Sequence, residues 1–176
     1  MLKRKLGAMV LLLCIVLAGC NDKNIWHNTT VEYPSPNKTN GIITLTLNIP
    51  PDVELTTASD DKLETLIYRN NSIIGNIACD KVEVSSDQNS TTEIYQRIIN
   101  SENTDWSLDE NLNRVKVKEL QQEGIIISTL KNIDSDIGIL IYIQELDTYI
   151  GIKILGDAFT SEEVDMLIAN IYINLL

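Results

Sequence analysis

The chain has 176 residues, with 25 Asp or Glu, 14 Lys or Arg and a formal charge of −11. This length suits one ordinary domain with short extensions, which excludes a two-lobed receptor of the usual transport-binding kind. The acidic balance excludes nucleic acid as an expected partner, because a phosphate backbone requires clustered Lys and Arg.

The first twenty residues have the three-part layout of a secretory leader. Lys3, Arg4 and Lys5 are basic, Leu6 to Leu17 is almost wholly apolar, and two small residues precede a cysteine. The apolar run is shorter than the ~20 residues that span a bilayer comfortably.

The stretch Leu17-Ala18-Gly19-Cys20 resembles the lipobox of bacterial lipoproteins. The resemblance implies a signal peptide over residues 1–19, lipidation of the Cys20 sulfur, and Cys20 as the mature N-terminus. The acyl chains, palmitate for example, would then anchor the protein at the extracytoplasmic face of the cell membrane, since two chains hold far more firmly than one. The alternative is an uncleaved amino-terminal membrane helix in which Cys20 has no role.

After the anchor, residues 20–40 are interpreted as a lipidated cysteine and flexible tether, because polar residues and two prolines dominate. Trp26, His27 and Tyr33 interrupt this polarity, and they either pack on the domain or lie at the membrane interface. Loss of the three basic leader residues would take the formal charge from −11 to about −14. Such a charge steers cationic partners toward the protein and disfavours flat contact with anionic lipid.

Residues 41–176 are predicted to form a single domain. Ile43, Leu45, Leu47 and Ile49 alternate with polar residues, which indicates a strand with one buried face that Pro50-Pro51 ends. A polar Asn70-Asn71-Ser72 turn predicts a hairpin, and Gly75 suggests a bulge or a close backbone approach. Further strands are expected over residues 53–57, 63–69, 73–84, 113–121, 124–131, 137–145 and 149–155. The apolar run Ile137 to Ile143 suits a central strand covered on both faces.

Two helices are expected, each opened by a capping box. Ser90 and Glu93 begin the first, over residues 90–100, and Thr160 and Glu163 begin the second. In the second, one apolar face is predicted from residues at helical spacing: Val164, Leu167, Ile168, Ile171, Tyr172 and Leu175. The predicted class is therefore α+β, a mainly antiparallel sheet of about six or seven strands with two helices.

The order of these elements resembles that of PsbP-like domains over residues 41–176. The shared features are a leading strand ending in Pro-Pro, a hairpin meander, and a capped closing helix after the strand Tyr149-Ile-Gly-Ile-Lys153. The resemblance implies an αβα sandwich as an alternative description of the fold, and it implies a non-catalytic accessory or binding protein.

Residues able to carry chemistry are few. His27 is the only histidine and lies on the predicted tether, so a Ser-His-Asp, Cys-His or zinc site is not expected. Cys79 follows an apolar run and is interpreted as a buried, inert thiol. Trp106 is a candidate binding residue, with packing as its alternative. No catalytic residue, metal site or cofactor is predicted.

Three groups of acidic residues could still suggest a metal or catalytic site. Asp134, Asp136 and Glu145 have the spacing of positions 1, 3 and 12 in a calcium-binding loop. Position 6 of such a loop requires glycine and is Ile139 here, so the sequence favours a turn that leads into a strand. Asp60-Asp61 and Asp109-Glu110 are interpreted as solvated loop charges and not as an acid–base pair.

The sequence thus favours a membrane-anchored, non-catalytic binding or accessory module for a protein or peptide of the cell envelope. A cationic peptide or protein is the partner that the charge favours. The alternatives are a small-ligand receptor or transport accessory, and a carboxylate-based envelope hydrolase.

Overall fold

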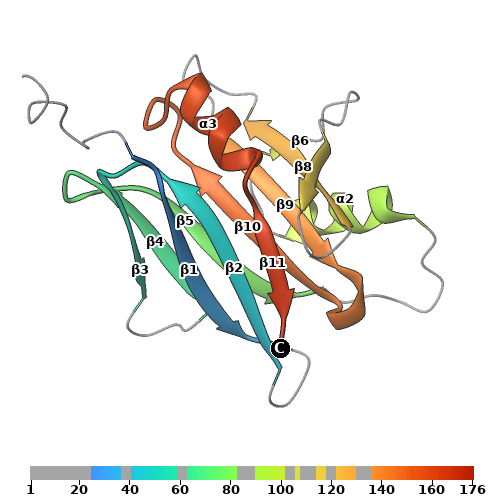
Figure 1. The fold of residues 1–176 in the computed structure, drawn as a ribbon. Coiled ribbons are helices and arrows are strands. Elements are labelled where there is room, and N and C mark those ends of the chain that lie inside the picture. The colour runs from blue at the N-terminus through green and yellow to red at the C-terminus, as the bar shows by residue number, and fades with distance from the viewer. Residues whose placement is uncertain are drawn as a thin grey trace, which may run out of the picture.

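The computed structural model describes residues 25–36, 41–58, 63–82, 90–101, 106–107, 114–117, 122–129 and 136–176. In these ranges the chain forms eleven strands in two antiparallel sheets, with two α-helices (Figure 1). The α+β class and the two helices are confirmed. The prediction of one sheet of six or seven strands is wrong, because the strands form two sheets, one of three strands and one of eight.

The smaller sheet, sheet A, has three strands in the order β1–β2–β11. Their bounds are β1 His27–Pro34, β2 Ile42–Ile49 and β11 Tyr172–Leu175. All eight residues of β1 pair with β2, from His27 opposite Ile49 to Pro34 opposite Ile42. The prediction of a flexible tether up to residue 40 is therefore wrong for residues 27–34.

The larger sheet, sheet B, has the order β3–β4–β5–β10–β9–β8–β6, with β7 also paired to β8. The strand bounds are β3 Val53–Thr57, β4 Glu64–Arg69, β5 Ser72–Lys81, β6 Trp106–Ser107, β7 Arg114–Val117, β8 Gln122–Thr129, β9 Ile137–Ile143 and β10 Thr148–Ile154. Each predicted strand after residue 41 thus has a counterpart. Sheet B continues from sheet A through Pro50-Pro51, which end β2 as expected.

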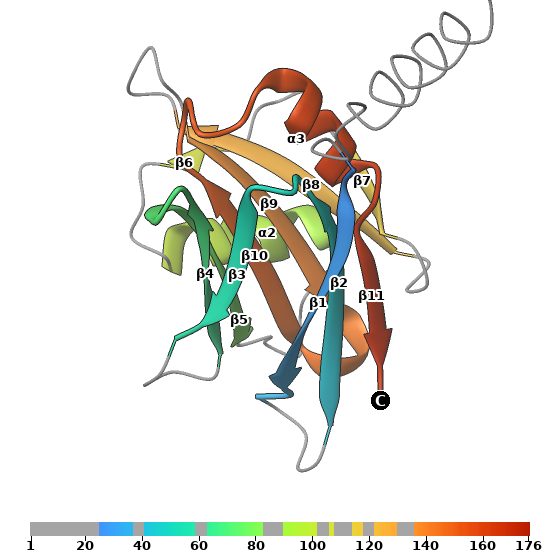
Figure 2. The ribbon, with the colours of Figure 1, turned by 60° about the vertical axis from the view of Figure 1, so that its left-hand side comes forward.

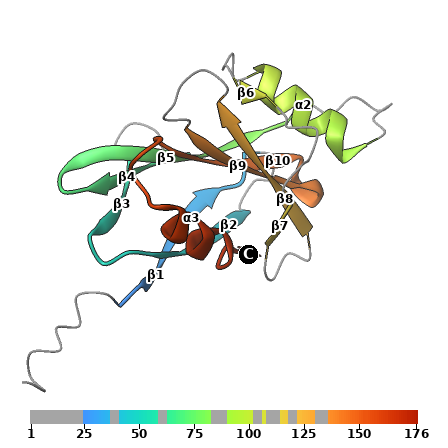
Figure 3. The same ribbon diagram turned by 90° about the horizontal axis from the view of Figure 1, so that it is seen from above.

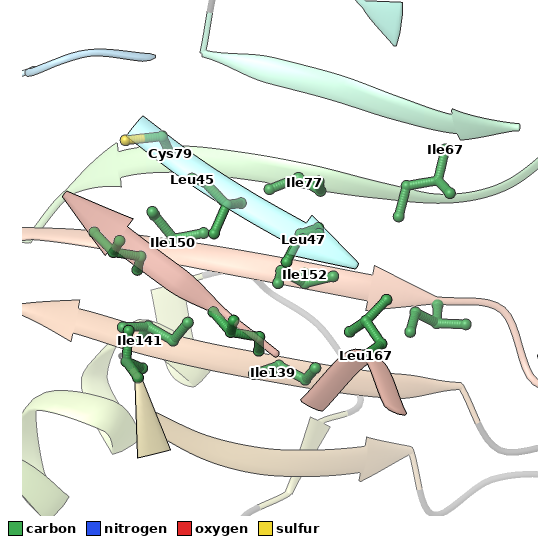
Figure 4. Close-up of a cluster of buried hydrophobic side chains, with 14 of the residues drawn as sticks. Leu45, Leu47, Ile67, Ile77, Cys79, Ile139, Ile141, Ile150, Ile152 and Leu167 are labelled. Carbon is green, nitrogen blue, oxygen red and sulfur yellow. The ribbon is translucent and has the colours of Figure 1, made fainter. Parts of the chain in front are cut away.

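The two sheets pack face to face, and their inner faces form the main core (Figures 2 and 4). Leu45 and Leu47 of β2 face Ile150 and Ile152 of β10, and all four are at most 1% exposed. Alternation of buried and polar residues along β2 produces this arrangement, because successive side chains of a strand point to opposite faces. Burying each such side chain contributes about 1.5–3 kcal/mol.

Strands β9 and β10 are apolar on both faces, and a helix covers the second face. Ile139 and Ile141 of β9 face sheet A, whereas Leu140 and Tyr142 pack against Ile98 and Ile99 of helix α2. Helix α2 spans Thr91–Ser101 and begins with the predicted box, since Glu93 N–H donates to Ser90 Oγ and Ser90 N–H to Glu93 Oε2. The expected two-sided burial of Ile137 to Ile143 is confirmed.

Tyr95 of α2 completes the backbone pairing of β9. The pairing between β8 and β9 ends at Leu140, so β8 offers no backbone partner to Tyr142 of β9. The N–H of Tyr142 donates to the Tyr95 hydroxyl at 3.1 Å. A buried N–H without a partner would cost about 1–3 kcal/mol. This hydrogen bond therefore fixes the helix against the sheet as well as satisfying the strand.

The last predicted helix is shorter than expected. Helix α3 spans Ser161–Ile168 and has the predicted capping box between Thr160 and Glu163. After Ile168 the chain turns and enters β11, in which Ile173 is buried against the core. The prediction that Ile171, Tyr172 and Leu175 continue the helix face is wrong.

The predicted turn and the predicted close approach are both confirmed on the hairpin of β4 and β5. Asn70 and Asn71 have φ of 52° and 63°, the left-handed pair that a tight hairpin turn requires. The pairing shifts between Ile67 and Tyr68, which is a bulge in β5. A Cβ on Gly75 would lie 2.2 Å from the carbonyl oxygen of Lys153, so only glycine fits.

We expect Gly75→Ala to lower the free energy of unfolding by about 1–3 kcal/mol, because the added carbon meets backbone that the sheet pairing holds in place. Gly151→Ala is the matched control, since its Cβ would meet only side chains at van der Waals distance, Leu140 at 3.4 Å and Tyr149 at 3.7 Å. Urea unfolding of both variants measures the difference. Equal stability of the two variants would contradict the close packing of β5 on β10.

Candidate binding face

Helix α2 covers only part of the outer face of sheet B. The helix packs on Leu140, Tyr142 and Tyr149, at the β9 side of the sheet, while α3 packs on the core side (Figure 3). Among the described residues, no helix packs on the outer side of β4 and β5. We call this part the open face, and it consists of Leu66, Tyr68, Ile73, Asn76, Ala78, Gly151, Lys153 and Leu155.

Strand register shows that these residues share one side. Leu66 pairs with Asn76, and Asn76 pairs with Lys153, while the residues between them, such as Ile67, Ile77 and Ile152, are buried in the core. A Cβ on Gly151 would contact Leu140 and Tyr149, which lie beneath α2. The open face is therefore continuous with the surface that α2 covers.

An apolar strip runs along one end of the open face. Tyr68 pairs with Ile73, and the N–H of Leu155 donates to the carbonyl of Ile74 next to it, at 2.9 Å. Ile73 is 52% exposed and Leu155 is 38% exposed, while Leu66 and Tyr68 are half-buried. Exposed apolar side chains on neighbouring strands form a contiguous patch, which marks a contact surface more often than isolated ones do.

Carboxylates border the open face, one beside this strip and two toward the other end of β5. Glu54 pairs with Tyr68, Glu64 pairs with Ala78, and Asp80 pairs with Tyr149. Glu64 Oε1 accepts a hydrogen bond from Asn76 Nδ2 at 3.0 Å, which holds it over the face. The positive charge of Lys153 is offset by Asp136, whose Oδ2 lies 3.2 Å from Nζ. The arrangement presents apolar area with a net negative rim.

Cys79 lies on the opposite side of the same strand and is 1% exposed. Burial, with a smaller effect from the charge of Asp80, raises the pKa of the thiol to about 12. The thiol is therefore protonated at neutral pH and screened from solvent. The prediction of a buried, inert thiol is confirmed.

Asp136 and Glu145 lie at opposite ends of β9, so they do not share a calcium loop. Besides its ion pair with Lys153, Asp136 accepts a hydrogen bond from the N–H of Gly156 at 3.1 Å. Glu145 is exposed in the 3₁₀ turn η1, Gln144–Leu146. The described residues hold no group of three or more His, Cys, Asp or Glu arranged to bind a metal ion.

The remaining predicted residues are only partly described. Cys20, Asp60, Asp61, Asp109, Glu110 and Asp134 lie outside the described ranges. The backbone of Trp106 is in β6, opposite Thr129, and its side chain lies outside the description. Neither described helix is long and apolar enough to cross a bilayer.

The aromatic residues of the expected tether belong to the domain. Tyr33 is fully buried, and its hydroxyl donates to Thr65 Oγ1 of β4 at 2.9 Å, which links the two sheets. Burial raises the pKa of Tyr33 to about 12. Trp26 is half-buried and His27 is exposed at the start of β1. Of the two alternatives for these residues, packing on the domain is confirmed for Tyr33.

A polar cluster around Arg69 was not anticipated from the sequence. Arg69 Nη2 lies 2.6 Å from Glu163 Oε1, Nη1 donates to the carbonyl of Ala158, and the guanidinium lies 4.8 Å from the centre of the Phe159 ring. Asp52 is a second anionic partner: Nη2 donates to its Oδ1 at 3.4 Å, and Nε lies 3.1 Å from its Oδ2 without the alignment of a hydrogen bond. The cluster joins the end of β4 to the start of α3.

These contacts shift the pKa of both partners. Burial would lower the pKa of Arg69, but the hydrogen bond and charge of Glu163, together with Asp52, raise it. Burial would raise the pKa of Glu163, but hydrogen bonds from Arg69 and from the Thr160 N–H lower it below its usual value. Both shifts follow from a structural ion pair.

Comparison of the chain with family models, curated proteins and solved structures gave no significant match.

We expect Glu163→Gln to lower the free energy of unfolding by about 1–2 kcal/mol at pH 7, because a partly buried, charge-assisted contact is lost. A carboxyl with a lowered folded pKa stabilises the fold above its unfolded pKa of about 4.3, and this contribution disappears as pH falls through the folded pKa. The stability difference between wild type and Glu163→Gln should therefore shrink below about pH 4.

Glu162→Gln is the control for this measurement, since Glu162 is exposed in the same helical turn. Chemical denaturation from pH 7 to pH 3 gives both differences. A Glu163→Gln effect that is no larger than that of Glu162→Gln, or that grows on acidification, would contradict the assigned ion pair.

Proposed function

We propose that the protein is a lipid-anchored, extracytoplasmic binding module whose open face docks a cationic protein or peptide of the cell envelope. The open face carries this proposal, because it combines exposed apolar side chains with a rim of carboxylates. The leader and the sequence Leu17-Ala18-Gly19-Cys20 support attachment to the cell membrane through Cys20.

Charge complementarity favours a cationic partner. Glu54 and Asp80 are exposed at the rim, and the lysine on the face, Lys153, is already neutralised by Asp136. The overall charge of −11 adds a long-range attraction that increases the rate of encounter with positive partners. The apolar strip of Tyr68, Ile73 and Leu155 then supplies contact area for the apolar side of the same partner.

The causes of the pKa shifts favour a binding role over a catalytic one. Shifted pKa values often accompany catalytic sites. Among the described residues, the groups with raised or lowered pKa are the buried Cys79 thiol and the members of three structural contacts: Arg69 with Glu163, Tyr33 with Thr65, and Tyr142 with Asp147, whose carboxylate accepts the Tyr142 hydroxyl at 2.8 Å. Each pair joins elements of the fold and lies apart from the open face.

A PsbP-like arrangement is part of the proposal. A strand ending in Pro-Pro, a long meander and a capped helix following the β10 strand support it, as does a sheet B with α2 on one side and α3 on the other. By analogy, such domains act through contact and not through bond chemistry.

The test uses the lipoprotein in nanodiscs of zwitterionic lipid and an amphipathic, Lys-rich helical peptide. The double variant Glu54→Lys/Asp80→Lys should weaken binding about tenfold, because two favourable charge contacts become repulsive. Raising the ionic strength should weaken wild-type binding as well. Isothermal titration calorimetry measures both effects.

The matched control is Glu32→Lys/Glu145→Lys, which changes the net charge equally at two exposed positions away from the open face. The proposal predicts that this control retains most of the affinity. Equal losses in the two double variants would show general electrostatic attraction without a docking face. Absence of binding to wild type would contradict the cationic partner.

A further inference from the structure

The ordered fold begins very close to the proposed anchor. Six residues, Asn21 to Trp26, separate Cys20 from His27, the first residue of β1. Even fully extended, this connection spans at most about 25 Å. The inference below rests on the proposed lipidation of Cys20. If that lipidation occurs, the start of β1 is held near the bilayer.

Several segments meet at this end of the domain. His27 pairs with Ile49 at the end of β2, Val53 at the start of β3 pairs with Arg69, and Arg69 pairs with Ser72 across the β4–β5 turn. The end of β10 lies at the same end of the molecule (Figure 1), and Leu155, the next residue, donates its N–H to the carbonyl of Ile74. We call this the anchor end. The turn η1 between β9 and β10 lies at the other end of the molecule.

The anchor end carries exposed apolar and uncharged side chains in addition to charged ones. Ile25 is 63% exposed, Ile73 52% and Leu155 38%. The turn residues Asn70, Asn71 and Ser72 are exposed and uncharged. The charged groups Asp52, Arg69 and Glu163 at this end neutralise one another in part, as described above.

We propose that the domain is oriented with its anchor end against the lipid bilayer, so that Ile25, Ile73 and Leu155 contact the headgroup layer. Each such residue contributes little on its own. The anchor, however, keeps these residues at the membrane at a high effective concentration, so weak contacts suffice to select one orientation.

The lipid chemistry that suits this contact is zwitterionic. Asp157, Glu162 and Asp165 are exposed on and before α3, which begins at the anchor end, and they repel an anionic surface. The contact should therefore weaken as the fraction of anionic lipid rises and recover when salt screens the repulsion. Basic amphipathic segments show the reverse dependence.

This orientation has a consequence for the open face. Ile73 and Leu155 belong both to the anchor end and to the apolar strip, so the open face starts at the headgroups and extends away from them along β5 and β10. While these two side chains contact lipid, Leu66 and Tyr68 of the strip remain for a partner. A partner on the open face is then captured within the layer next to the membrane.

The experiment places one environment-sensitive fluorophore on the lipidated full-length protein in vesicles. Ser72→Cys labels the anchor end, and Glu145→Cys labels the exposed η1 turn at the other end. The native Cys79 is buried and unreactive, so it does not compete for the label. Quenching by lipids that carry a nitroxide at the headgroup reports proximity to the membrane.

We expect the Ser72→Cys label to be quenched several-fold more than the Glu145→Cys label in phosphatidylcholine vesicles. The changes Ile25→Ser and Ile73→Ser together should remove most of this difference, and Ile42→Ser, at a 39% exposed apolar residue of the other end, should leave it intact.

Equal quenching of the two labels in protein whose mass shows lipid at Cys20 would overturn the orientation while leaving the proposed anchor in place. A mass without lipid at Cys20 would overturn both. Stronger quenching at the Ser72→Cys label with rising anionic lipid would also contradict the proposed contact.

Discussion

The fold depends on burying both faces of the central strands β9 and β10. Their side chains are apolar on both faces, with Ile139 and Ile150 on one face and Leu140 and Tyr149 on the other. Sheet A covers the first face, and α2 covers the second only over part of its width. The part toward β4 and β5, which no described helix covers, is the open face. The proposed binding surface is therefore a direct result of where the covering helix stops.

Most of the elements could be predicted because each carries a local signal. Alternation in β2, the Asn70-Asn71 turn and the two capping boxes are short-range patterns, and all are found in the structure. The sequence does not predict strand β1, because its outward residues are polar and it ends at Pro34. Only Val31 and Tyr33 indicate burial. A polar edge strand resembles a linker until its partner is known.

The end of α3 could not be located for a related reason. Ile171 and Leu175 fit a helical face at a spacing of four, but Ile171, Ile173 and Leu175 also fit the alternation of a strand. The free edge of β2 decides between them, because Ile173 pairs with Leu45 there. Only the tertiary arrangement supplies that edge.

The open face could not be predicted from the sequence, because its residues come from three strands. Leu66, Ile73 and Leu155 become neighbours only through the register of β4, β5 and β10, and that register contains a bulge. The Arg69 cluster is similar, since Asp52 and Glu163 are 111 residues apart in the chain. Local composition indicated an acidic domain, while the pairing of strands determined where apolar and acidic groups meet.

Site-specific photocrosslinking in the intact cell envelope tests the central claim most directly. A benzophenone amino acid would replace Tyr68 on the open face or, as a matched position, Tyr172 on the outer face of sheet A, and both tyrosines are half-buried. Our account predicts a discrete crosslinked product with a basic protein or peptide from Tyr68 and none from Tyr172. Crosslinks from Tyr172 alone, or identical products from both positions, would contradict the open face as the binding surface.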